Sequence, residues 1–137
     1  MNDKSGEMAV SPATVAAFTA ERSRIIQMTV ARSLKRTEVA QHGEDAEHLL
    51  TIGLDFTTQA IMIAMQLVNP ALLDQQLQWG NTRLPHDGVS AGQLLQRFQI
   101  LAEVIAETLA PLEAQAVNCY VDRLIQREAA LVQGANR

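Results

Sequence analysis

Residues 90–109 read SAGQLLQRFQILAEVIAETL, and this stretch decides the fold class. Apolar side chains recur along it at the spacing of one face of an α-helix. That apolar face holds Leu94, Leu95, Phe98, Leu101, Ala102, Ile105 and Leu109. The opposite face holds Gln96, Gln99, Glu103 and Glu107, which we expect to be solvated. Because the Ser90 hydroxyl can accept a hydrogen bond from an orphan backbone amide, the pattern predicts a capped amphipathic helix over 90–109.

The same helical period continues on both sides of this stretch. Ser11-Pro12 and Asn69-Pro70 each place a capping side chain before a proline that suits the first helical turn. The predicted helices span residues 12–38, 44–68, 70–83, 90–109 and 111–133. No stretch shows the alternation of a strand. The sequence therefore predicts an all-α fold, a five-helix bundle with a globin-like arrangement as the alternative, in which a flexible segment 1–10 precedes a single helical domain 11–134.

The predicted helix 44–68 is the most apolar in the chain. We expect its inward face to hold Leu49, Ile52, Phe56, Ala60, Ile63 and Leu67. The run Ala60–Met65 is apolar all round, which favours a central helix or one that is half core and half dimer interface. In the predicted helix 111–133 we expect Val117, Tyr120, Leu124 and Leu131 to face inward, and the seven-residue spacing of Val117, Leu124 and Leu131 indicates a short coiled-coil seam.

Composition excludes several function classes. The net charge of −4 gives no electrostatic reason to expect nucleic acid. Arg32, Lys35 and Arg36 share one face near a helix C-terminus, which we interpret as a solvated helix end. Cys119 is the single cysteine, so no disulfide framework exists and we expect it to be buried. No signal peptide and no membrane-length apolar run is present, so we expect a cytoplasmic protein without a membrane partner.

The sequence carries none of the usual catalytic or metal-binding motifs. It lacks a Gly-rich phosphate loop, a nucleophile elbow, a Cys-x-x-Cys and a His-Glu-x-x-His. His42, His48 and His86 are too few for a hemerythrin-type centre, and Asp45-x-x-His48 is a single approximate match where di-iron bundles need paired Glu-x-x-His motifs. We therefore predict a protein that is not an enzyme and has no metal site.

His48 is the most interesting titratable residue. Asp55 lies two helical turns away on the same side, so the pair could bind a ligand, ligate haem or accept phosphate. The simpler alternative is a boundary histidine that makes one hydrogen bond. Histidine phosphotransfer domains carry an exposed histidine followed closely by Leu, Lys and Gly; here Thr51 replaces the lysine and Gly53 comes one position late. Phosphotransfer through His48 is therefore an alternative function.

Two large aromatic side chains, Trp79 and Phe98, fall on neighbouring predicted helices. Small-molecule sites in bundles favour aromatic residues between helices, although plain core packing is the alternative interpretation. We name His48, Trp79 and Phe98 as candidate cofactor-binding residues, with the cofactor itself unidentified. A haem-binding or pigment-binding sensor domain is the second alternative function.

The stretch from His48-Leu49 through Asn69-Pro70, with Leu73, Trp79 and Gly88-Val89, resembles the helical N-terminal sensor modules of bacterial signalling proteins. These modules precede STAS domains in stressosome proteins, cobalamin-binding domains or kinases, and the resemblance spans residues 44–130. It implies an all-α, sometimes globin-like fold, a homodimer, and regulation rather than catalysis. No output domain follows, so the chain is expected to be an excised sensor domain or a stand-alone regulator. We predict a dimeric sensory module whose partners are a second copy, another signalling protein or output domain, and a small-molecule ligand.

Overall fold

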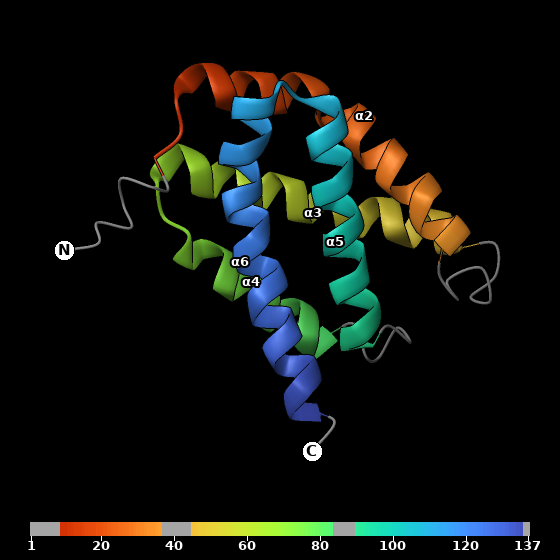
Figure 1. Cartoon of the computed structure of the whole chain (residues 1–137). Coiled ribbons are helices and arrows are strands. Elements are labelled where there is room, and N and C mark those ends of the chain that lie inside the picture. Colours follow the sequence, from red (N-terminus) through yellow and green to blue (C-terminus); the bar gives the residue numbers. More distant parts are fainter. Residues whose placement is uncertain (1–8, 37–44, 84–89, 136–137) are drawn as a thin grey trace.

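A computed structural model describes residues 9–36, 45–83 and 90–135, and this part of the chain holds five α-helices (Figure 1). They are α2 (Pro12–Arg36), α3 (Ala46–Leu67), α4 (Ala71–Arg83), α5 (Ala91–Thr108) and α6 (Pro111–Ala135). Each begins and ends within about two residues of its predicted bounds. The prediction of an all-α protein with five helices packed together is confirmed. The predicted breaks at 41–43 and 84–88 and the flexibility of residues 1–8 lie outside the described residues.

The helix ends follow from the capping residues. The Ser90 hydroxyl accepts from the Gln93 amide (3.2 Å) while the Gln93 side chain accepts from the Ser90 amide (2.9 Å). These two reciprocal bonds form a capping box. Ser11 likewise accepts from the Thr14 amide (3.1 Å) at the start of α2. Stretches 12–36 and 91–108 therefore begin where their serines can satisfy otherwise unpaired amides.

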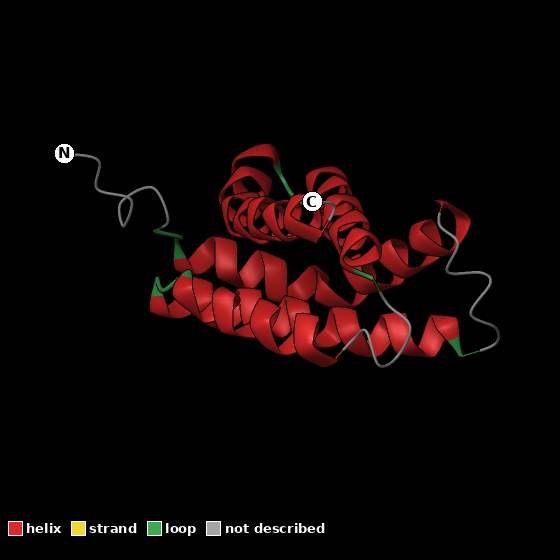
Figure 2. Ribbon diagram, turned by 90° about the horizontal axis from the view of Figure 1, so that it is seen from below, coloured by secondary structure: helices red, strands yellow, loops and turns green. Residues whose placement is uncertain are grey.

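The helices form two crossing layers. Helices α5 and α6 lie side by side, and they cross α2 and α3, which pack against each other (Figures 1 and 2). Helix α4 follows α3 through a tight turn at Val68, whose φ of 48° is left-handed, and it contacts α3 and α6. The main core lies between the layers and includes the almost wholly buried Phe18, Ile25, Ile61, Met65, Leu73, Leu101, Ile105, Tyr120 and Leu124.

The prediction for the inward face of α3 was wrong. Its buried residues are Ala46, Leu50, Leu54, Thr57, Thr58, Ile61, Ala64 and Met65. Five of the six residues expected inside are exposed, namely Leu49, Ile52, Phe56, Ile63 and Leu67. Thr57 and Thr58 can be buried because their hydroxyls donate to the carbonyls of Gly53 (2.9 Å) and Leu54 (2.8 Å). The helix therefore has apolar residues on two faces, and its threonines do not mark the solvent side.

This two-faced composition also explains a second property of α3. Within the described residues it is the one helix long and apolar enough to cross a membrane, judged by length and composition alone. Its buried face packs against α2 and the core of the bundle. Core helices of folded domains meet the same criterion, and 39% of the apolar window of α3 is buried inside this bundle.

The basic end of α2 and the acidic face of α5 were both expected to be solvated. In the structure they form ion pairs with each other. Arg32 donates to Glu107 (2.7 Å) and Arg36 to Glu103 (2.7 Å). The hydrogen bond from Arg36 holds the pKa of Glu103 below its ordinary value. The basic end of α2 therefore faces acids of its own chain and is not a free anion site.

Two predictions for α6 need correction. Leu131, expected inward, is 48% exposed because the last turns of α6 extend beyond the ends of α4 and α5 (Figure 1). Val117 and Leu124 of the same seven-residue seam are fully buried, as expected. Cys119 is half-buried rather than buried. Arg123 and Arg127 both donate to Asp74, which ties α6 to α4.

Candidate ligand-binding cleft

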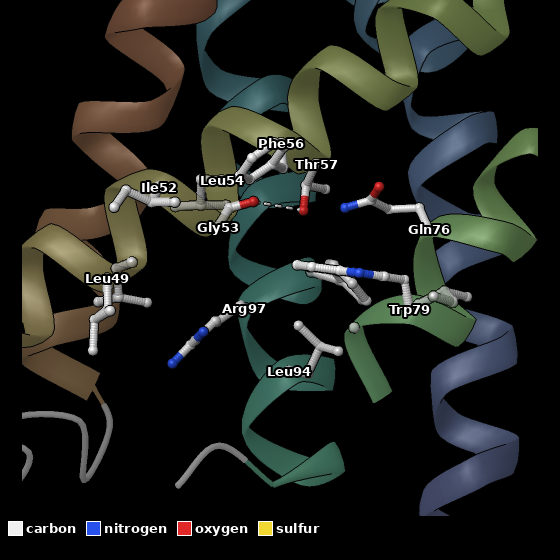
Figure 3. Close-up of a pocket in the computed structure, with 14 residues that line it drawn as sticks. Leu49, Ile52, Gly53, Leu54, Phe56, Thr57, Gln76, Trp79, Leu94 and Arg97 are labelled. Atoms are coloured by element: carbon white, nitrogen blue, oxygen red, sulfur yellow. Dashed lines mark hydrogen bonds between the residues drawn. The ribbon is translucent and has the colours of Figure 1, made fainter. Parts of the chain in front are cut away.

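A cleft of about 320 Å³ lies between α3, α4 and α5, and we call it the Trp79 cleft (Figure 3). Seven of its lining residues come from α3, four from α4 and three from α5. The α3 residues fall at 49, 50, 52, 53, 54, 56 and 57, so the first half of this helix forms one wall. The tight turn after α3 brings α4 back as the second wall.

The cleft has a buried floor and an exposed apolar rim. Leu54, Leu77 and Phe98 are at most 5% exposed and form the floor. Phe56 and Trp79 are 50% and 55% exposed at the rim, with ring centroids 6.3 Å apart and planes inclined by 50°. Figure 3 shows the Trp79 indole extending from α4 across the space beside α5. Large apolar side chains left half-exposed in one concave place are typical of a binding site rather than of ordinary surface.

Gly53 explains why space remains in this wall. A Cβ placed on Gly53 would meet no other atom within 4 Å. Glycine in a helix interior costs about 1 kcal/mol relative to alanine, because it gives up backbone entropy and buries no side chain. The chain therefore carries an unfavourable residue at a position where any side chain would project into empty space.

Few polar side chains reach the cleft. Thr57 uses its hydroxyl within α3, and Gln76 comes from α4. Arg97 is the charged member of the lining, and it is only 8% exposed. Burial lowers the pKa of Arg97, but a guanidinium stays protonated at neutral pH even so.

The structure brings together two of the three predicted site residues. Trp79 and Phe98 line the same cleft, one at its rim and one in its floor. His48 is exposed on the first turn of α3 and is outside the cleft lining. Asp55, expected to work with His48, instead forms an ion pair with Arg22 of α2. A cofactor role for these residues, and phosphotransfer through His48, stay predictions.

Sequence reasoning missed Arg97, Gly53 and the α3 wall. One signal was present for Arg97, because it lies three residues after Leu94 and four before Leu101 on the apolar face of residues 90–109. A cation on the buried face of a helix is unusual and needs either a partner or a function. For Gly53 the signal was a glycine within a strongly helical segment.

The described residues contain no group of three or more His, Cys, Asp or Glu side chains that could hold a metal ion. Glu128 is a fully buried acid, but it lies between α6 and α4 against Asn81 and outside the cleft lining. The lining of the Trp79 cleft is therefore mostly apolar, with Arg97 as its single charged residue.

No protein-family model, curated protein sequence or solved structure matches this chain.

Proposed function

We propose that this chain is a non-catalytic regulatory module that binds a small, largely apolar molecule in the Trp79 cleft and works as a homodimer. The observation that carries the ligand part is the cleft itself, where Gly53 faces open space and the Phe56 and Trp79 rings are half-exposed. Ligand sites in proteins have volumes of roughly 300 to 1,000 Å³ and mostly apolar walls with a few polar groups. The Trp79 cleft fits the lower end of that range.

A ligand in this cleft would contact three helices at once. Helix α3 packs its other face on α2, and α5 packs on both α2 and α6. A molecule that binds better when α3, α4 and α5 are held together shifts the packing of the whole bundle toward that arrangement. Such a shift is the signal that we expect a partner protein or output domain to read.

The wider biological setting rests on the resemblance of residues 44–130 to sensor modules of bacterial signalling proteins. That resemblance supports a cytoplasmic signal-transduction role and a globin-like form of the bundle. Both are proposals about this chain.

Filling the space at Gly53 tests the ligand part. We expect Gly53→Leu to weaken binding of the neutral probe N-phenyl-1-naphthylamine at least about tenfold, because the new side chain occupies the cleft. Trp79, the single tryptophan of the chain, reports binding through energy transfer to the probe. The fold should be kept or stabilised, since a helix-interior glycine is replaced by a good helix former.

Gly134→Leu is the matched control. A Cβ at Gly134 also meets nothing within 4 Å, and this residue lies near the end of α6, outside the cleft lining. It should bind the probe as the wild type does. Equal binding by Gly53→Leu and the wild type, or no binding by the wild type, would show that the Trp79 cleft is not a ligand site.

The dimeric part is supported by the second half of α3. Ile63, Leu67 and Val68 are 41%, 64% and 40% exposed at the end of this helix away from the cleft. A second copy related by a two-fold axis would bury the same patch on both chains. Native mass spectrometry of protein purified without denaturation should show a dimer of the 15.0 kDa chain, and Leu67→Glu should convert it to monomer. A wild type that stays monomeric at high concentration would contradict this part.

A further inference from the structure

Arg97 differs from the other arginines of the described chain. Each other arginine whose side chain is described forms an ion pair with a carboxylate of this chain, and these are Arg22, Arg24, Arg32, Arg36, Arg123 and Arg127. Arg97 forms no ion pair with a described residue, and its Nε is buried without a hydrogen-bond partner. Among the arginines whose side chains are described, the one most withdrawn from water is thus the one that forms no ion pair with a described carboxylate.

A buried cation without a counter-charge is costly. Moving a charged group out of water loses its solvation, and only a well-placed partner recovers that loss. Helix α5 nevertheless keeps Arg97 on its buried face, one helical turn from Leu94 and beside Phe98. An arginine retained in this setting is best explained by an anion that arrives with the ligand.

The direction of the side chain places that anion. Figure 3 shows Arg97 extending from α5 toward the end of α3 that carries Leu49, whereas the Trp79 ring extends from the α4 side. The cleft therefore has a cationic end and an aromatic end. None of its lining residues is acidic, so no neighbouring carboxylate of the lining competes with an incoming anion.

We propose that the ligand of the Trp79 cleft is an amphipathic carboxylic acid, whose carboxylate takes two hydrogen bonds from the Arg97 guanidinium. Its apolar chain then lies along Ile52, Phe56 and Trp79. A guanidinium and a carboxylate are both planar and form two parallel bonds, which makes this pairing stronger than a single neutral hydrogen bond. A volume of 320 Å³ equals that of about ten liquid waters, which suits a medium-chain acid such as octanoate. This inference rests on the proposed function, that the cleft binds a small molecule.

A comparison of octanoate with octan-1-ol tests the role of the head group, with binding measured by calorimetry and by Trp79 fluorescence at pH 7.5. The wild type should bind octanoate at least about tenfold more tightly than octan-1-ol. Arg97→Met, which removes the charge but keeps an unbranched side chain, should lose this preference and keep its affinity for the alcohol. Arg24→Met makes the same charge change on a side chain that is 66% exposed, and should behave as the wild type.

The outcomes separate the two proposals. Equal binding of the acid and the alcohol by the wild type, or a preference for the acid that survives in Arg97→Met, would overturn the carboxylate inference. If the wild type still binds octan-1-ol and Gly53→Leu does not, the cleft remains a ligand site with another head-group preference. If the wild type binds neither compound nor the neutral probe, both proposals are wrong.

Discussion

Replacing Ile61 with alanine is expected to lower the free energy of unfolding by about 2 to 5 kcal/mol, whereas the same change at Ile63 should lower it by less than about 1 kcal/mol. The two isoleucines are two residues apart, so they face nearly opposite sides of α3. Ile61 is fully buried in the main core, and Ile63 is 41% exposed. Urea denaturation of both variants at low protein concentration, followed by far-UV circular dichroism, measures the difference.

This pair of variants is its own control, because residue type, helix and chemical change are identical. Equal losses at low concentration would show that α3 is rotated about its axis relative to the structure described above. A loss at Ile63→Ala that appears only as the protein concentration rises would instead place Ile63 in the proposed dimer interface, since the stability of a dimer depends on concentration.

The helices were predictable from local chemistry. Ser11-Pro12, Asn69-Pro70 and Ser90 mark helix starts through side chains that satisfy nearby amides, and such bonds need no information from distant parts of the chain. The apolar period of residues 90–109 is one-sided, and Leu94, Leu101 and Ile105 are buried as predicted. A one-sided pattern favours one rotation of the helix, but Leu95 and Ala102 of the predicted face are only half-buried, and Arg97, Ile100 and Val104 are buried in addition.

The rotation of α3 was not predictable in the same way. Its two apolar faces are of similar size, so hydrophobic period alone does not select one of them. The face of α3 that becomes buried is determined by its contacts with the neighbouring helices. The Arg22 side chain of α2 donates to Thr58 (2.9 Å) and pairs with Asp55, which fixes the threonine side of α3 toward α2. These partners lie 36 and 33 positions apart in sequence, beyond the reach of local pattern reading.

The candidate site was predictable in part. Trp79 and Phe98 were expected on neighbouring helices, and the turn after α3 and the crossing of α5 place both on the Trp79 cleft. Arg97 and Gly53 gain their roles only once α3, α4 and α5 come together around the cleft, because an arginine becomes buried and a glycine borders an open space only through tertiary structure. His48 shows the opposite case. Asp55 lies at the right spacing to act with His48, but it forms an ion pair with Arg22 of α2.

A buried acid of the described core lies outside both the cleft and the surface ion pairs. Glu128 of α6 is fully buried; one carboxylate oxygen accepts from the Asn81 side chain (2.9 Å) and the other has no hydrogen-bond partner. Burial raises the pKa of Glu128 above its ordinary value of 4.5, and the Asn81 hydrogen bond offsets only part of this effect. The ionised carboxylate is therefore poorly accommodated in the folded chain.

Replacing Glu128 with glutamine is expected to raise the free energy of unfolding at pH 7 by about 1 to 3 kcal/mol, because the buried negative charge is removed while the hydrogen bond from Asn81 can be kept. A carboxyl group whose pKa is higher in the folded chain favours folding fully below its unfolded value of 4.5, and this contribution is lost as the pH rises through the folded pKa. The wild type and Glu128→Gln should therefore have equal stability near pH 4 and diverge toward neutral pH. Thermal denaturation across this range measures the divergence. A Glu128→Gln variant that is less stable than the wild type at pH 7 would contradict this prediction. It would mean that a partner stabilises the ionised carboxylate more than burial destabilises it.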